Sequence, residues 1–129
     1  MQIPNKNLGV NVDRDTFELL VGDALDSLPE DIAAAMDNVE VVVEEEPPID
    51  YLSELGPGRT LLGLYHGIPL TRRSYYDRAL PDRISIYRGP ITRLARTPAA
   101  IKEQVRRTVI HEVAHHFGID DDRLRELGW

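Results

Sequence analysis

The stretch that decides the fold is His111-Glu-Val-Ala-His-His-Phe-Gly-Ile-Asp-Asp121, near the end of the sequence. It places two histidines, His111 and His115, four residues apart, with Glu112 directly after the first. Four residues make about one turn of an α-helix, so both imidazoles project from one face and can bind a single metal ion. Glu112 lies at the edge of that face. Its carboxylate can therefore reach a water molecule beside the ion rather than the ion itself.

A break in the helix follows the second histidine and offers a third ligand. Gly118 is predicted to end the helix, because glycine adopts the left-handed conformation of a helix terminus at little cost. The chain can then turn back toward the ion, and Asp121 stands three residues beyond Gly118. We predict one zinc ion, Zn2+, held by His111, His115 and Asp121. Glu112 is the predicted catalytic base.

Two other carboxylates near this end of the chain compete for the role of Asp121. Asp120 is the predicted N-cap of a last short helix through Leu124 and Leu127, which leaves Asp121 as the ligand. Glu126 is a weaker substitute, because it lies about two helical turns further on. The sequence contains no cysteine, so any metal must be held by His, Asp or Glu. Three protein ligands are typical of catalytic zinc, whereas structural zinc usually has four.

The helix that carries these residues is predicted to have Thr97 as N-cap and Pro98 in its first turn, and to end near Phe117. His116 is rotated by about 100° from His115, so we expect it to face away from the ion. His66, at the end of a predicted strand, is expected to be solvent-exposed or to orient substrate. The apolar row that faces the core consists of Ile101, Val105, Val109, Val113 and Phe117, with Ile110 beside its end.

The first half of the chain predicts two helices and a strand. Asp13 or Asp15 caps a helix whose apolar residues recur at spacings of three and four between Phe17 and Leu28. Pro29 begins a second helix over residues 30–36, and residues 39–43 are typical of a strand. Residues 44–58 contain prolines, glycines and successive glutamates, so we predict an exposed loop there.

Residues 60–65 and 84–88 are predicted to be two further strands, each stopped by a glycine and a proline. Between them, the arginine-rich residues 70–82 are compatible with a helical turn or a loop. These elements predict an α+β fold, in which a small three- to four-stranded mixed sheet packs on the metal-binding helix beside N-terminal helices and a short C-terminal helix. A chain of 129 residues fits one domain, residues 1–129.

Charge is unevenly distributed along the chain, which has a net charge of −7. Residues 1–58 carry 14 acidic and 2 basic side chains, while residues 59–107 carry 11 basic and 3 acidic ones. We expect the acidic part to pack against the basic part, since the arginines are too dispersed for a nucleic-acid-binding helix. No stretch approaches the roughly 18 apolar residues of a spanning helix, and the N-terminus lacks an apolar signal segment. A soluble, cytoplasmic protein without membrane contact is expected.

Over nearly its whole length the sequence resembles a family of small bacterial zincin-like proteins classed as zinc metallopeptidases. The matching segments are residues 62–71, 84–91 and 111–121. The pattern His-Glu-x-x-His-x-x-Gly-x-x-Asp also resembles the extended metzincin signature, with aspartate replacing the third histidine. The resemblance implies a minimal zincin core with His111, His115 and Asp121 as ligands and Glu112 as base. Both methionines precede the motif, so the methionine turn that metzincins place after the third ligand is absent.

The expected activity is zinc-dependent hydrolysis of a peptide or protein substrate, with Glu112 as general base toward water. The edge of the sheet over residues 60–65 is expected to hold an extended peptide by strand addition. Candidates for the donor that stabilises the oxyanion are Tyr65, Tyr75, Tyr76 and Tyr87. The alternative is a non-catalytic or weakly active zinc-binding domain with a regulatory or interaction role. Glu112→Ala separates the two hypotheses, because it lowers turnover only in an enzyme.

Overall fold

The computed structural model describes residues 12–55, 60–67 and 81–128. Its three strands form one mixed sheet in the order β1-β3-β2, with β1 parallel and β2 antiparallel to β3. This confirms the predicted α+β fold with a small mixed sheet. None of the helices in these ranges combines the length and hydropathy that crossing a membrane requires. The elements are α1 (Arg14–Asp26), α2 (Glu30–Ala35), β1 (Val39–Glu44), α3 (Ile49–Leu55), β2 (Gly63–His66), β3 (Asp82–Tyr87), α4 (Arg88–Leu94), α5 (Pro98–His116) and α6 (Asp121–Glu126).

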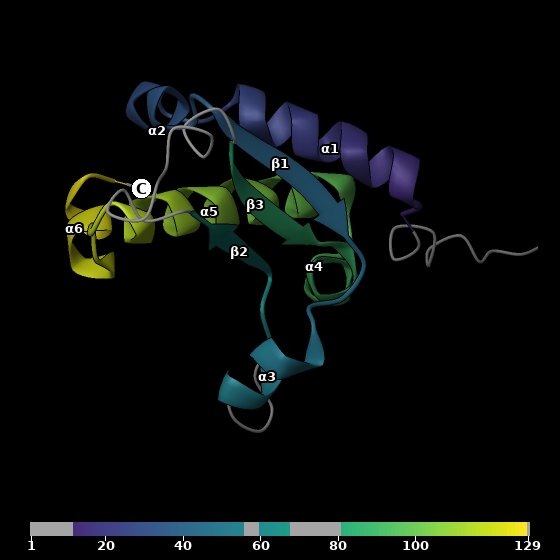
Figure 1. Cartoon of the computed structure of the whole chain (residues 1–129). Coiled ribbons are helices and arrows are strands. Elements are labelled where there is room, and N and C mark those ends of the chain that lie inside the picture. The colour runs from purple at the N-terminus through teal and green to yellow at the C-terminus, as the bar shows by residue number, and fades with distance from the viewer. Residues whose placement is uncertain (1–11, 56–59, 68–80, 129) are drawn as a thin grey trace, which may run out of the picture.

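The longest helix, α5, packs across the sheet and organises the core. Figure 1 shows α5 crossing behind the sheet, with α1 beside β1. Ile84 and Ile86 of β3 are fully buried in the same cluster as the apolar row of α5. Burying one such side chain stabilises the fold by about 1.5–3 kcal/mol. Phe117, predicted to end the row, is instead 57% exposed, because it is the C-cap residue beyond the last helical turn. The buried row is Ile101, Val105, Val109 and Val113.

The predicted helix starts are largely confirmed. Thr97 caps α5 by accepting a backbone hydrogen bond at 3.1 Å, and Pro98 lies in the first turn. Asp13, rather than Asp15, caps α1 through a hydrogen bond of 2.9 Å. The strands β1 and β3 lie close to their predicted positions, whereas β2 begins only at Gly63. Side-chain caps were predictable because they depend on neighbouring residues alone.

The loop predicted for residues 44–58 is wrong in its central part, which forms α3. The carbonyl of Pro48 accepts hydrogen bonds from the backbone N–H of Tyr51, at 3.0 Å, and of Leu52, at 3.4 Å. Both of these side chains are half-buried. The prolines that argued against regular structure precede the first turn, where a missing N–H has no helical partner to lose.

The end of the third predicted strand needs a similar correction. The strand stops at Tyr87, and Arg88 is already the first residue of α4, which no sequence pattern had indicated. Gly89 and Pro90, which were expected only to stop the strand, lie in the first turn of this helix, a position that tolerates proline. Thr92 closes this turn, since its hydroxyl donates to the carbonyl of Arg88 at 2.8 Å.

Strand β2 and the glycine that follows it lie along α5 in a fixed register. Two residues of a strand advance by about 6.6 Å, and four residues of a helix by about 6 Å. Alternate residues of the strand can therefore meet successive turns of the helix. The contacting pairs are Gly63 with Thr108, Tyr65 with Glu112, and Gly67 with His116.

Gly63 permits the close approach of β2 to α5, and we predict that Gly63→Ala destabilises the protein by about 1–3 kcal/mol. An added Cβ would lie 2.7 Å from Cγ2 of Thr108 and 2.9 Å from the carbonyl oxygen of Ser85, so side chain and backbone would both have to move. Urea unfolding measures the loss. Gly22→Ala is the control, because its Cβ meets nothing within 4 Å inside α1. Equal stability of the two variants would contradict the tight packing of β2 on α5.

Ion pairs join the acidic and basic parts of the chain, as the charge distribution predicts. Nη2 of Arg88 lies 2.6 Å from Oε1 of Glu45, and its Nε lies 3.0 Å from the same oxygen. Nη1 of Arg93 lies 2.9 Å from Oε2 of Glu46. A hydrogen bond from Arg88 to the carbonyl of Val12, at 2.7 Å, ties the chain before α1 to the same place. The side-chain hydrogen bond from Arg88 lowers the pKa of Glu45.

This lowered pKa predicts that Glu45 contributes stability that is lost in acid. A carboxyl whose pKa is lower in the folded state stabilises the fold above its unfolded pKa and stops doing so as the pH falls through the folded value. We expect the free energy of unfolding of wild type to fall more steeply below about pH 4.5 than that of Glu45→Gln. Urea unfolding from pH 3 to pH 7 measures both slopes. Parallel curves would show that the ion pair has no net effect.

Candidate metal centre

The three side chains predicted as ligands come together at the C-terminal end of α5. Nε2 of His115 lies 3.0 Å from Oδ1 of Asp121, and Nδ1 of His111 lies 3.6 Å from the same oxygen. One ligand atom from each residue lies within 4.8 Å of the other two. Donors around a tetrahedral zinc ion are about 3.3 Å apart, given bonds of about 2.0–2.1 Å. The separations and the two-nitrogen, one-oxygen donor set therefore fit zinc after small side-chain movements.

The turn that brings Asp121 to the histidines is built from backbone hydrogen bonds. Gly118 has a φ of +82°, and its N–H donates to the carbonyl of His115 at 3.0 Å. The N–H of Ile119 donates to the carbonyl of Ala114 at 2.8 Å, which completes a Schellman motif. An added Cβ at Gly118 would meet no atom within 4 Å, so the backbone conformation rather than space selects glycine. The predicted helix break is confirmed.

Asp120 and Asp121 divide two roles between neighbouring positions. The side chain of Asp120 caps α6 by accepting a hydrogen bond from the N–H of Arg123 at 2.9 Å, as predicted. Asp121 is the first residue of α6, and its side chain points back to the histidines of α5. The hydrogen bond with His115 lowers the pKa of Asp121, so this carboxyl is ionised and suited to a cation. Glu126, the weaker alternative, pairs with Arg123 at 2.9 Å.

Glu112 stands beside the ligands but belongs to the row of α5 that faces β2. Its Oε1 accepts a hydrogen bond of 2.9 Å from the backbone N–H of Tyr65. Burial raises the pKa of the Glu112 carboxyl, while the bond from Tyr65 and the nearby His115 and His111 oppose this rise. A raised pKa is favourable for a group that must accept and release a proton near neutral pH. The geometry therefore separates Glu112 from the cluster of His111, His115 and Asp121.

His116 faces away from the metal ligands, as the helical rotation predicts. Its ring stacks on that of Tyr65, with ring centroids 3.9 Å apart and planes tilted by 20°. The hydroxyl of Tyr65 donates to Oδ2 of Asp82 at 2.7 Å. These contacts hold the end of β2 against the last turn of α5. Because the N–H of Tyr65 donates to Glu112, they also fix the position of the Glu112 carboxylate.

The tyrosines considered as oxyanion donors do not occupy that position in the described residues. The hydroxyl of Tyr65 is engaged with Asp82. Tyr87 is 1% exposed and follows Ile86, a core residue, so it points to the sheet face opposite α5. There, burial and the nearby Glu44 raise its pKa. The other two candidates, Tyr75 and Tyr76, lie outside the described residues.

His66 lies on the same outer face as Tyr87 rather than at the metal centre. Its Nε2 is 3.3 Å from the hydroxyl of Ser85, which donates to Oε2 of Glu44 at 2.7 Å. Burial and the neighbouring Arg83 lower the pKa of His66, so the ring is neutral at physiological pH. His66 is half-buried in a local network, so the expected solvent exposure is wrong. Its expected contact with substrate stays a prediction.

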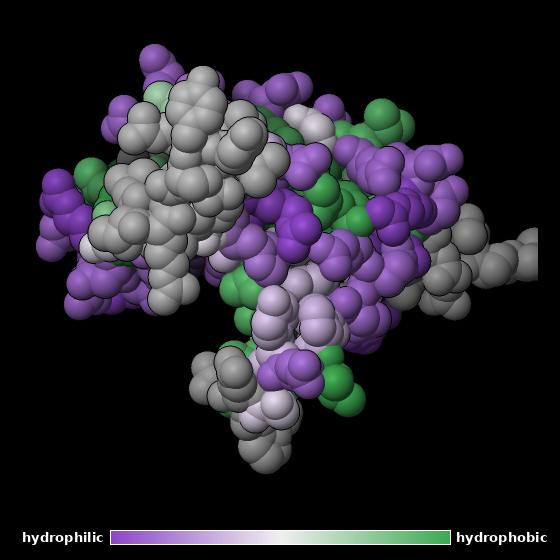
Figure 2. Space-filling model, in the orientation of Figure 1, coloured by the Kyte–Doolittle hydropathy of each residue, from purple (hydrophilic) through white to green (hydrophobic). Residues whose placement is uncertain are grey.

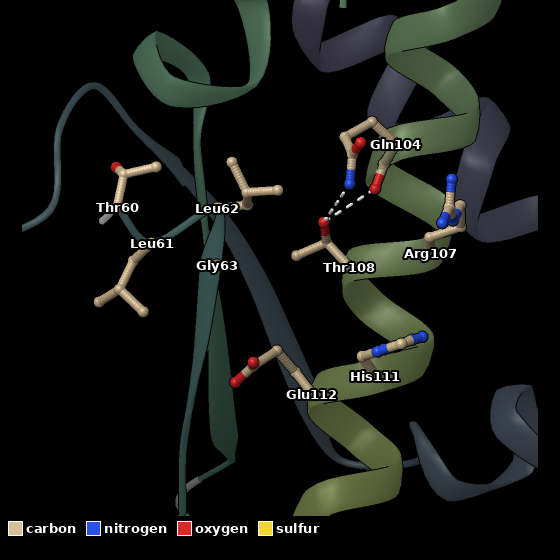
Figure 3. Close-up of a pocket in the computed structure, with 9 residues that line it drawn as sticks. All are labelled: Thr60, Leu61, Leu62, Gly63, Gln104, Arg107, Thr108, His111 and Glu112. Carbon is tan, nitrogen blue, oxygen red and sulfur yellow. Dashed lines mark hydrogen bonds between the residues drawn. The ribbon is translucent and has the colours of Figure 1, made fainter. Parts of the chain in front are cut away.

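A cavity of about 250 Å³, lined at one end by His111 and Glu112, runs along the gap between α5 and β2. In Figure 3, Gln104, Thr108 and Glu112 point from α5 toward β2, while Arg107 and His111 lie together on the neighbouring side of the helix. Figure 2 shows that the surface is hollowed between the α6 end of the molecule and α3. The strand side of the cavity is lined by Thr60, Leu61, Leu62 and Gly63.

Several of these residues were not identified from the sequence. Arg107 lies four residues before His111, so the spacing that revealed the ligands could also have placed it beside them. No local pattern predicts that Tyr65 contacts Glu112, because the two residues are 47 positions apart. No sequence pattern places Gln104 and Thr108 in a cavity either, because the cavity exists only once β2 packs beside α5.

Comparisons with known proteins agree with this geometry. A family model described as zincin-like metallopeptidase matches residues 36–129. A comparison with curated proteins finds no match. The fold is similar to that of a conserved hypothetical protein from T. thermophilus, with a TM-score of 0.54 and 24% identity over 90% of this chain and 97% of that one. Residues 111–121, the helix α5 and all three strands of the described sheet lie within the matched residues. The chain belongs to the zincin-like metallopeptidase family.

Proposed function

We propose that this protein is a zinc-dependent metallopeptidase that hydrolyses peptide bonds. The observation that carries the proposal is the convergence of His111, His115 and Asp121 around one point, with Glu112 beside them at the mouth of a cavity. No fourth potential protein ligand joins this group in the described residues. Three protein donors leave a position open for water or substrate, which is the arrangement of catalytic zinc sites.

The edge of β2 is suited to hold an extended peptide. The N–H of Tyr87 donates to the carbonyl of Leu62, which makes these two residues a hydrogen-bonded pair. In an antiparallel ladder such pairs alternate with pairs whose backbone groups point outward. Gly63 belongs to the next pair, so its N–H and carbonyl are directed away from β3, toward the cavity. A substrate strand can pair with these groups while its scissile bond lies at the ligands.

Zinc bound by the three ligands would supply Lewis acidity, which activates water and polarises the scissile carbonyl. Glu112 accepts the proton of the attacking water and then delivers it to the leaving amine. The hydrogen bond from Tyr65 holds one oxygen of this carboxylate and leaves the other available for the proton. His115 and Asp121 are about half-exposed, so substrate can approach the site from solvent.

The alternative, a zinc-binding domain without catalysis, keeps the ligands and leaves Glu112 only its structural hydrogen bond with Tyr65. The half-buried position of Glu112 beside the ligands favours the enzyme. Partial removal from water raises the free energy of a charged carboxylate, and this destabilises the folded protein unless hydrogen bonds compensate. Its hydrogen bond of 2.9 Å from Tyr65 offsets part of that cost, and proton transfer explains the rest of the arrangement.

Metal analysis tests the zinc site directly. Purified wild-type protein dialysed against zinc should retain about one equivalent of metal, as expected for three converging ligands. His115→Ala should lose it, and Asp121→Asn should bind zinc at least 10-fold more weakly, since changing even an outer partner of a ligand costs about 10- to 100-fold. Asp122→Asn is the matched control, because Asp122 is exposed and pairs with Arg125 instead. Equal zinc affinity of the Asp121 and Asp122 variants would remove Asp121 from the ligand set.

Turnover of peptides tests the base. Glu112→Gln keeps the side-chain size and an oxygen for the hydrogen bond from Tyr65, but it cannot accept the proton of water. We expect kcat to fall by about 100- to 10,000-fold while zinc affinity stays within a few-fold of wild type. Glu103→Gln, which changes an exposed glutamate on the same helix, should retain full activity. Equal turnover of wild type and Glu112→Gln on every peptide tried, at equal zinc occupancy, would contradict the enzymatic function.

A further inference from the structure

We infer that Arg107 makes this site selective for substrates with a carboxylate on the C-terminal side of the scissile bond. The inference deepens the proposed peptidase function and rests on it. Arg107 lines the cavity that begins at His111 and Glu112. It is thus a charged residue of the cavity wall that the proposed metal chemistry does not use.

Arg107 continues the row of α5 that carries the metal ligands. The residues of this row, Arg107, His111 and His115, are each four positions apart, and Figure 3 shows Arg107 and His111 on the same side of the helix. One turn of helix separates Arg107 from His111 by about 6 Å along the axis. An extended peptide advances by about 3.3 Å per residue, so this distance corresponds to about two residues of substrate.

The charge of Arg107 is available for a ligand. Its side chain is exposed, and within the described ranges no ion pair or hydrogen bond engages it. The adjacent Arg106, by contrast, pairs with Glu103 at 3.6 Å. The part of the cavity wall nearest Arg107 on α5 and the strand side are formed by the uncharged Gln104, Thr108 and residues 60–63, while His111 and Glu112 lie at the far end. A guanidinium is a planar fork of donors that binds a carboxylate through two hydrogen bonds, so a carboxylate is the group that this wall recognises.

The register of β2 against α5 fixes which side of the substrate meets Arg107. Gly63 lies at Thr108 and Tyr65 lies at Glu112, so β2 and α5 run in the same direction. Antiparallel pairing is the more stable way to add a strand to β2. Such a peptide runs from the ligands toward the N-terminal end of α5. The residues after the scissile bond therefore approach Arg107, and either an acidic side chain or the terminal carboxylate of the peptide can occupy this place.

The test begins with the cleavage of a mixed peptide library by the zinc-loaded protein. Mass spectrometry of the products locates the cuts, and peptides are then made that differ only at the second residue after the cut, as Glu, Gln or Lys. A second pair ends at this residue with a carboxylate or an amide, which separates side-chain from terminal recognition. We expect kcat/KM for Glu to exceed that for Gln by about 10- to 100-fold, the strength of a charge-assisted hydrogen bond, or the carboxylate to exceed the amide by this factor.

Arg107→Glu should abolish this preference and favour Lys instead. Arg96→Glu is the matched control, because it makes the same change of charge at an exposed position outside the cavity. It should keep the wild-type preference. Arg107→Lys should retain the direction of the preference with a smaller ratio, since a lysine cannot form the bidentate pair.

Binding measurements separate this inference from the proposed function. Fluorescence anisotropy of the same labelled peptides is recorded with zinc-loaded Glu112→Gln protein, which need not cut them. If the library is not cleaved, labelled peptides of one fixed sequence that end in a carboxylate or an amide replace them. Tighter binding of the carboxylate-ended peptide that Arg107→Glu removes would then mean that the carboxylate site stands and the peptidase fails. If peptides are cleaved without any effect of charge near the cut, or with an effect that survives Arg107→Glu, the inference is overturned and the peptidase stands.

Discussion

The packing of β2 along α5 is the constraint on which the rest of the structure depends. A strand and a helix can stay in register over several turns only because two strand residues and four helix residues cover nearly the same length. Gly63 removes the side chain that would otherwise keep the two apart. Once β2 is placed, Tyr65 holds Glu112, and the opposite wall of the substrate cavity is already formed. The edge of the sheet and the side chains of the candidate site thereby form one continuous surface.

Two neighbouring rows of α5 then perform different tasks. The row facing β2 contains Glu112, which is half-buried and has a raised pKa because burial disfavours its charged form. The next row contains His111 and His115, whose side chains are 41% and 49% exposed. The two histidines, the proposed ligands, are therefore accessible from solvent, while Glu112, the proposed base, is more buried. This division follows from helical geometry, since residues one apart point in directions about 100° apart.

The position of Asp121, the proposed third ligand, depends on the backbone turn after α5. Asp121 reaches the histidines because Gly118 adopts a left-handed conformation and closes a Schellman motif, after which Asp120 starts α6 with a side-chain cap. Each step uses hydrogen bonds between residues close in sequence. Distant parts of the chain are joined instead by ion pairs such as that between Arg88 and Glu45, which link the acidic first half to the basic middle.

Most of the candidate site could be predicted from the sequence, because its residues are close together in the chain. The spacing of the histidines, the glycine break, the caps at Thr97 and Asp120 and the outward rotation of His116 all follow from the geometry of a single helix and its ends. The helices α3 and α4 were not predicted from the sequence. Prolines stand in or before the first turn of each, where they do not prevent a helix.

Only the tertiary structure decided which distant residues surround the ligands. It placed Tyr65 on Glu112 and on His116, directed Tyr87 and His66 to the outer face of the sheet, and brought the strand edge beside Arg107. These outcomes depend on strand register and on which face of the sheet packs against α5. A shift of one residue would reverse every side chain of β2, and no pattern within the strand itself excludes that shift.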